Sequence, residues 1–209
     1  MTRAERASLL HGIYVVVDDA ESALDVARAS LDAGVRVLQY RAKSGIVVSR
    51  LRALRALARD RASLLILNDD WRAAIENASD GVHLGPGDDG FSDLTTVRAR
   101  MPEALIGLSC ANEAEMRTAR AAGADYAGVG AVYATPSKSD AGAPIGIDGL
   151  LRVASAAALP VAAIGGINLE NVGAVKRSGV AMAAVISAVA SAADPATAAR
   201  ELVRAWESA

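Results

Sequence analysis

Aromatic residues are scarce in this sequence, at 3% of 209 residues, although hydrophobic residues make up 52%. A chain of this length buries a substantial core, which with so few rings must consist mainly of Ala, Val, Leu and Ile. Such small and branched side chains suit the close packing of helices against a sheet.

Four further absences argue against particular classes of protein. The sequence has no Lys or Arg run and a formal net charge of -2, which argues against a nucleic-acid-binding surface. Its single cysteine, Cys110, excludes an internal disulfide and a cysteine-based structural metal site, and a reducing cytoplasm is the expected setting. Apolar runs stop well short of the roughly 20 residues that span a bilayer. Residues 1–11 are polar, so we also expect no signal peptide there.

Short β-rich apolar runs alternate with longer amphipathic stretches along the whole chain, a pattern typical of repeated βα units around a parallel sheet. Strands are predicted at 12–17, 35–40, 64–67, 81–84, 105–109, 126–130, 161–164 and 183–186. Helices are predicted at about 20–33, 46–60, 71–78, 92–100, 112–122, 147–157, 169–178 and 195–207. Ala33-Gly34, Ala122-Gly123 and Ser178-Gly179 lie where a helix should end in a left-handed cap. Asn112, with Glu115 three residues later, should begin one.

The position of the glycines decides between two α/β architectures. An open doubly wound sheet would carry a glycine-rich loop after its first strand, but that strand ends in Val17-Asp18-Asp19. Gly165-Gly166 instead follows the seventh strand, where barrels commonly hold a phosphate. The sequence therefore predicts one (β/α)8 TIM-barrel domain with short loops over residues 1–209, with residues 1–11 as an N-terminal extension.

Polar residues follow the second strand at alternating positions, as Gln39, Arg41 and Lys43. Alternation places these side chains on one side of the strand, so an amide and two cations would face a common point at the barrel mouth. This arrangement suits a pyrophosphate. The alternative is a strand end exposed to solvent.

Carboxylates follow the third and fourth strands. Asp69 and Asp88 lie on neighbouring loops, where they could share a Mg²⁺ that keeps several waters and bridges to phosphate oxygens. Asp70 is better placed to cap the helix that starts at Trp71. His83 lies inside a strand, and we interpret it as a packed or hydrogen-bonded structural histidine.

The later units supply a long loop and a second candidate anion site. Thr135, Ser137 and Lys138 lie in a loop that runs to Gly146, of a length typical of lids that close over a substrate. Gly166 and the Ile186-Ser187 pair follow the seventh and eighth strands, where backbone N–H groups can approach a phosphate. No histidine near Cys110 in sequence would activate it, so we interpret that residue as packed.

Taken together and in this order, these segments resemble the thiamine phosphate synthase family from residue 14 to about residue 190. The matching stretches are Gln39-Tyr40-Arg41-Ala42-Lys43, Asn68-Asp69-Asp70, DGVHLGPGD at 80–88, GLS at 107–109, GADYAGVGAVYATPSK at 123–138, AAIGGI at 162–167 and VISAV at 185–189. Each piece is modest, and their ordered combination is specific.

The resemblance implies a Mg²⁺-dependent condensation of hydroxymethylpyrimidine pyrophosphate with hydroxyethylthiazole phosphate, which gives thiamine phosphate and pyrophosphate. By resemblance, Asp69 and Asp88 hold the metal, while Arg41, Lys43 and Lys138 neutralise the departing pyrophosphate. The pyrimidine substrate would be bound by Gln39, Arg41, Lys43, Asn68, Ser109 and Lys138. The thiazole phosphate would be bound by Thr135, Ser137, Gly166, Ile186 and Ser187. The expected partners are these two substrates, and a homo-oligomer is possible.

Two departures from the family pattern concern the site. Pro86-Gly87 stands where the family usually has Gln-Glu, and residues 137–141 differ from the usual Thr-Lys-Lys-Asp-Thr. Two alternatives therefore stay open: an isomerase that resembles thiazole tautomerase, and a non-catalytic sensor of phosphorylated ligands. Retention of both Asp69 and Asp88 beside the cations favours the synthase.

Overall fold

The computed structural model describes residues 1–135, 137 and 142–209 and shows a closed barrel of eight parallel strands. Strands are hydrogen-bonded in sequence order, and the last pairs with the first. The strands are β1 (Gly12–Asp18), β2 (Val37–Arg41), β3 (Leu64–Asn68), β4 (Gly81–Leu84), β5 (Leu105–Cys110), β6 (Tyr126–Val129), β7 (Val161–Ile164) and β8 (Met182–Val185). The predicted (β/α)8 barrel is confirmed.

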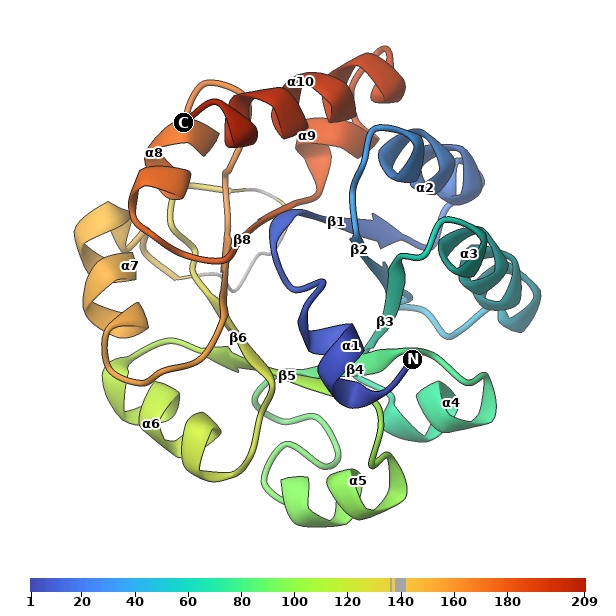
Figure 1. The fold of residues 1–209 in the computed structure, drawn as a ribbon, viewed down its shortest axis with the longest axis vertical. Coiled ribbons are helices and arrows are strands. Elements are labelled where there is room, and N and C mark those ends of the chain that lie inside the picture. The colour runs from blue at the N-terminus through green and yellow to red at the C-terminus, as the bar shows by residue number, and fades with distance from the viewer. Residues whose placement is uncertain (136, 138–141) are drawn as a thin grey trace.

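Helices surround the barrel as a ring, and one further helix lies across its centre in Figure 1. They are α1 (Arg3–Ala7), α2 (Ala23–Asp32), α3 (Val48–Asp60), α4 (Trp71–Glu76), α5 (Leu94–Arg100), α6 (Glu113–Ala121), α7 (Gly146–Ala154), α8 (Val172–Arg177), α9 (Ser187–Ala190) and α10 (Pro195–Glu207). The short helices α1 and α9 were not predicted from the sequence. The others lie where they were predicted, with shifts of a few residues at their ends.

Helix ends follow the capping residues read from the sequence. Asn112 accepts a hydrogen bond from the Glu115 N–H at 3.0 Å at the start of α6, and Asp70 accepts one from the Ala73 N–H at the start of α4. Helix α2 ends at Asp32 and is followed by Gly34, which has a φ of 101°, and the Val35 N–H donates to the Ser30 carbonyl. This Schellman cap draws Val35 into the turn. Strand β2 consequently begins at residue 37 and not at the predicted residue 35.

Two apolar clusters lie on opposite sides of the barrel wall. Tyr14, Ile66, Tyr126 and Met182 belong to the cluster that fills the barrel. The neighbours of Tyr14 along the strand pack outward against the helices. Successive side chains of a strand point to opposite faces, so a strand such as β1 contributes to both clusters.

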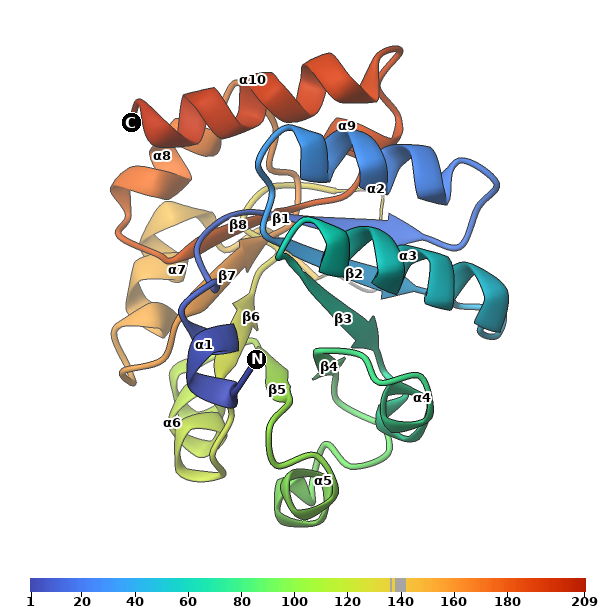
Figure 2. The same cartoon turned by 45° about the vertical axis from the view of Figure 1, so that its right-hand side comes forward.

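The N-terminal segment covers the barrel end at which the strands begin. Arg3 Nε donates to Asp125 at 2.6 Å and Arg6 Nε donates to Asp80 at 3.2 Å, and these two carboxylates immediately precede β6 and β4. Leu10 belongs to the inner cluster. Figure 2 shows the N-terminus at this end, whereas the C-terminus ends α10 on the outer ring. No helix in the described part of the chain is long and apolar enough to cross a membrane.

Candidate active site

A cavity of about 880 Å³ lies at the opposite end of the barrel, where the strands end. All of the predicted site residues within the described part of the chain line it: Gln39, Arg41, Lys43, Asn68, Asp69, Asp88, Ser109, Thr135, Ser137, Gly166, Ile186 and Ser187. Lys138 lies outside the described residues. Segments distributed over the whole chain thus meet in one place, because parallel strands of a barrel all end at the same rim.

Arg41 is held by a carboxylate that sequence analysis did not assign to the site. Its Nε donates to Asp18 Oδ1 at 2.5 Å and its second terminal nitrogen donates to Asp18 Oδ2 at 2.9 Å. The register of β1 and β2 places the two residues side by side. A paired carboxylate fixes the plane of the guanidinium group, which can still offer its remaining N–H groups to an anion. The sequence signal was present, since Asp18 ends the strand next to the one that ends at Arg41.

Asp88 is placed by a tight turn that contains both residues of the first family departure. The Asp88 N–H donates to the Gly85 carbonyl at 3.1 Å, with Pro86 and Gly87 between them. Proline at the second turn position and glycine with a φ of 95° at the third are the requirements of a type II turn. The Gly85 N–H in return donates to Asp88 Oδ2 at 2.6 Å. Pro86-Gly87 therefore stiffens the loop that carries this carboxylate.

Asp69 reaches the cavity through an uncommon backbone conformation, with a φ of 68°. Aspartate and asparagine tolerate this left-handed region better than other residues that carry a Cβ. Asp69 and Asp88 both line the cavity. Within residues 1–135, 137 and 142–209, no three His, Cys, Asp or Glu side chains form a group that could hold a metal ion. Two carboxylates fit a Mg²⁺ whose other ligands are water and substrate oxygens.

The two glycines after β7 are required by the local backbone conformation and packing. Gly165 and Gly166 have φ values of 101° and 65°. A Cβ added to Gly165 would lie 2.6 Å from Ala131 Cα, and one added to Gly166 would lie 2.7 Å from Tyr133 Cβ. The segment after β6 packs directly on this turn, so a side chain at either position would displace it. The sequence predicted a phosphate site at these glycines, and the close packing of the segment after β6 is a second requirement for them.

A smaller cavity of about 350 Å³ adjoins the rim near β1, β2 and α9. Arg41, Lys43, Ser137 and Ser187 line both cavities. Two cations and two hydroxyl-bearing residues therefore lie together between the end of β2 and the start of α9. Asp18 and Asp19 also line the smaller cavity, while the cations and hydroxyl groups offer hydrogen-bond donors that suit phosphate groups.

His83 joins a buried chain of hydrogen bonds at the cavity floor. Its Nδ1 lies 3.1 Å from the Tyr126 hydroxyl, and its Nε2 lies 3.1 Å from Ser109 Oγ. Tyr126 contacts the Tyr14 hydroxyl at 3.0 Å, and Tyr14 accepts a hydrogen bond from Gln39 Nε2 at 2.9 Å. His83 is hydrogen-bonded, as predicted, but it also lines the cavity. Neither tyrosine was predicted to belong to the site, although both occupy inward positions of their strands.

Cys110 lies in the cavity wall and is buried. Burial, assisted by the Glu115 charge, raises the pKa of its thiol to about 11. The thiol therefore stays protonated near neutral pH and is a poor nucleophile. This supports its interpretation as a packed residue.

A closed barrel with a polar cavity at the carboxyl ends of its strands is the architecture of (β/α)8-barrel enzymes. The family model described as thiamine monophosphate synthase matches residues 13–189, and the chain belongs to this family.

Individual relatives agree with this assignment. The chain is 44% identical over 206 residues to the thiamine biosynthesis bifunctional protein ThiM/ThiE of Symbiobacterium thermophilum. The match covers 96% of this chain and 41% of that longer protein. It is 35% identical to the thiamine-phosphate synthase of Caldivirga maquilingensis, with 95% of this chain and 98% of the relative covered. Among solved structures, thiamine phosphate pyrophosphorylase from Pyrococcus furiosus superposes with a TM-score of 0.86 at 32% identity, over 98% of both chains.

Proposed function

We propose that this protein condenses hydroxymethylpyrimidine pyrophosphate with hydroxyethylthiazole phosphate to give thiamine phosphate and pyrophosphate. The observation that carries the proposal is that one cavity gathers every predicted site residue in the described part of the chain. Its volume of about 880 Å³ lies within the range of ligand pockets, roughly 300 to 1,000 Å³. The family and the Caldivirga relative are described as thiamine phosphate synthases, and that activity supports these two substrates.

Charge at the rim supports a reaction that releases an anion. Breaking the C–O bond of the pyrimidine substrate sends its electron pair to pyrophosphate and leaves a positive charge on the pyrimidine methylene carbon. Arg41 and Lys43 face the same space and would stabilise the growing negative charge of the leaving group. The thiazole nitrogen then forms the new C–N bond with its own lone pair. No residue of the protein has to act as a nucleophile.

Asp69 and Asp88 are the residues that would hold Mg²⁺. When bound, the ion would neutralise phosphate oxygens and orient the pyrophosphate. The turn through Pro86-Gly87 limits the positions available to Asp88, and the Asp69 backbone directs the second carboxylate into the cavity. Both carboxylates therefore line the cavity despite the departure from the usual family residues.

An assay with purified protein, both substrates and Mg²⁺ tests the proposal. We expect thiamine phosphate and pyrophosphate in equal amounts, and neither product when one substrate is omitted. Isomerisation of a thiazole carboxylate phosphate without the pyrimidine partner would instead identify a tautomerase. Binding of both phosphorylated ligands without conversion would identify a sensor. Either result would reject the proposed condensation.

A matched pair of neighbouring substitutions tests the metal ligands. Asp69→Asn removes a carboxylate but keeps a residue that tolerates the positive φ, so turnover should fall at least 100-fold while the circular dichroism spectrum is retained. Asp70→Asn makes the same chemical change one residue later, at a helix cap where Asn serves as well as Asp. That control should keep both activity and stability. Full Mg²⁺-dependent activity in Asp69→Asn would refute the metal assignment.

A further inference from the structure

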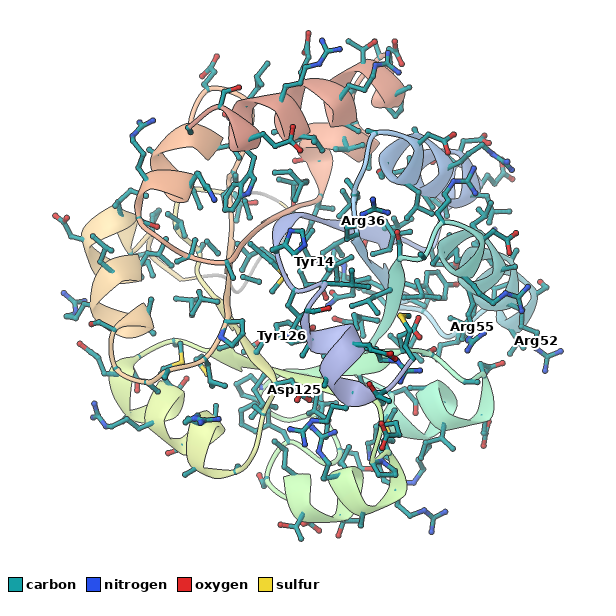
Figure 3. The ribbon with its side chains drawn as sticks, in the orientation of Figure 1. Tyr14, Arg36, Arg52, Arg55, Asp125 and Tyr126 are labelled. Atoms are coloured by element: carbon teal, nitrogen blue, oxygen red, sulfur yellow. The ribbon has the colours of Figure 1, made fainter. Side chains whose placement is uncertain are left out.

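The hydrogen-bond chain at the cavity floor connects two predicted pyrimidine-binding residues through three residues that the family resemblance did not assign. It runs from Gln39 on β2 through Tyr14 on β1, Tyr126 on β6 and His83 on β4 to Ser109 on β5. Gln39, Tyr14, His83 and Ser109 line the cavity, whereas Tyr126 is fully buried and does not. Figure 3 shows the Tyr14 and Tyr126 side chains within the ring of strands.

The positions of the hydroxyl protons determine which group donates in each of these hydrogen bonds. Burial raises the pKa of both tyrosines, so each hydroxyl carries its proton near neutral pH. Tyr14 accepts from Gln39 Nε2, which leaves the Tyr14 proton to be donated to Tyr126. If Tyr126 donated to Tyr14 instead, the Tyr14 proton would have no hydrogen-bond acceptor within the described part of the chain. Buried hydroxyl protons that lack an acceptor are costly, which favours the first direction.

The same reasoning determines which ring nitrogen of His83 carries the proton. A Tyr126 hydroxyl that accepts from Tyr14 donates its own proton to His83 Nδ1, at 3.1 Å. Neutral imidazole then carries its proton on Nε2, which donates to Ser109 Oγ at 3.1 Å. The Ser109 proton is left over, and Ser109 lines the cavity. The serine is therefore set as a hydrogen-bond donor toward a ligand.

Glycines on two strands make room for the rings of this chain. A Cβ added to Gly107 would lie 2.5 Å from the Tyr126 hydroxyl oxygen, and one added to Gly128 would lie 3.0 Å from His83 Cε1. The His83 and Tyr126 rings are packed with their centroids 5.5 Å apart. The two rings thus sit in slots that exist only because two inward positions of the barrel lack side chains. Such confinement restricts both rings to the observed hydrogen-bonded arrangement.

We propose that Tyr126 is a positioning residue, which holds His83 as the Nε2-protonated neutral tautomer and thereby sets Ser109 as a donor to the pyrimidine ring of the substrate. The identity of that ring rests on the proposed function. A pyrimidine that bears an amino group presents ring nitrogens as acceptors and N–H groups as donors. A site with fixed donors and acceptors can distinguish these edges from those of other rings of similar size.

Nuclear magnetic resonance tests the tautomer without any reference to catalysis. The chain contains two histidines, so ¹⁵N labelling of histidine gives two sets of ring signals, which a His11→Gln variant assigns. In the parent protein we expect the His83 ring to carry its proton on Nε2. In Tyr126→Phe, which keeps the ring in its slot, we expect a substantial population with the proton on Nδ1. A parent protein protonated on Nδ1, or a Tyr126→Phe spectrum identical to the parent, would overturn the proposal.

Kinetics test the consequence for the substrate. Loss of one neutral hydrogen bond should raise the KM for the pyrimidine pyrophosphate about fivefold in Tyr126→Phe. The KM for the thiazole phosphate should change less than twofold. In a Ser109→Ala background the same substitution should have almost no further effect, because the group through which Tyr126 acts is already gone. Equal KM changes for both substrates, or full additivity with Ser109→Ala, would reject a positioning role.

Tyr40→Phe is the matched control. Tyr40 is also fully buried on a strand, and its hydroxyl donates to Asp19 at 2.6 Å, but it packs in the outer core. The Tyr40→Phe substitution should lower stability without a selective effect on the KM for the pyrimidine pyrophosphate.

Failure of the proposed function can be distinguished from failure of this proposal. A parent protein that binds both substrates but makes no thiamine phosphate would refute the proposed function alone, since the histidine spectrum would still decide the tautomer.

Discussion

Replacing Asp125 with alanine should destabilise the protein strongly without changing its substrate affinities. The Asp125 side chain is 5% exposed and immediately precedes β6, at the end of the barrel that α1 covers. Its Oδ2 accepts from Arg98 at 2.5 Å and from the buried Ile106 N–H at 2.7 Å, and its Oδ1 accepts from Arg3. Figure 3 shows Asp125 beside α1.

The magnitude follows from the groups left behind. An unsatisfied Ile106 N–H costs about 1–3 kcal/mol. Removal of one partner of a buried ion pair costs about 3–5 kcal/mol, but Arg98 also donates to the Ala104 and Gly123 carbonyls, which retain part of its hydrogen bonding. Arg3 is 41% exposed and contributes little. Because these effects overlap, we expect a loss of about 3 kcal/mol in the free energy of unfolding, and a melting temperature lower by about 6–12 °C.

Urea unfolding of Asp125→Ala and of an Arg3→Ala control measures this loss. The control removes only the exposed partner and should cost less than about 1 kcal/mol. Both variants should keep the parent KM for each substrate, because the cavity lies at the other end of the strands. A loss below about 1 kcal/mol in Asp125→Ala would show that the carboxylate is not needed to satisfy this cluster. A selective change in KM would show that the two barrel ends are coupled.

Further substitutions and one labelling experiment test the division of the site. Arg41→Ala should raise the KM for the pyrimidine pyrophosphate about 10- to 100-fold, since charged hydrogen bonds are lost, whereas Ser187→Ala should raise that for the thiazole phosphate about fivefold. Equal effects on both substrates in steady-state titrations would contradict separate anion pockets. Gly166→Val should impair both binding and folding, because its Cβ would meet Tyr133, and a parent-like melting curve would show that the segment after β6 yields. A pKa of about 11 leaves about one Cys110 in a thousand as thiolate at pH 8, so a disulfide reagent should label native protein far more slowly than urea-unfolded protein. Equal rates would contradict burial of the thiol.

The architecture was predictable because each βα unit carries its own local signals. The glycine caps at residues 34 and 123 and the N-cap at Asn112 mark the helix ends in the sequence, and strand order follows from a closed parallel barrel. Helix α1 was missed although Thr2 and Glu5 form a capping box, which is a signal present in the sequence. Its five residues include no buried residue, and its other side-chain contacts include Asp80 and Asp125, which are distant in sequence. A polar segment of this kind has no apolar periodicity from which a helix can be predicted.

The rim of the site was predictable for a similar reason, since polar residues directly after buried strands must collect at one end of a barrel. Its floor was not. Strands of a parallel barrel are buried on both faces, so Tyr14 and Tyr126 look like any other core residue until the inward positions are known. Asp18 at the end of the first strand was visible in the sequence, but its pairing with Arg41 follows only from the register of β1 and β2.

The positions of the two chain ends bear on how such a barrel can be combined with other catalytic units. The N-terminus lies at the barrel end opposite the cavity, and the C-terminus follows α10 on the outer ring (Figure 2). A polypeptide joined at either end would leave the mouth open to substrate, provided that an N-terminal connection preserved the contacts of Arg3 and Arg6. The Symbiobacterium relative, of which this chain matches 41%, is a bifunctional protein. The geometry of this barrel is compatible with tethering a second enzyme without rebuilding the site.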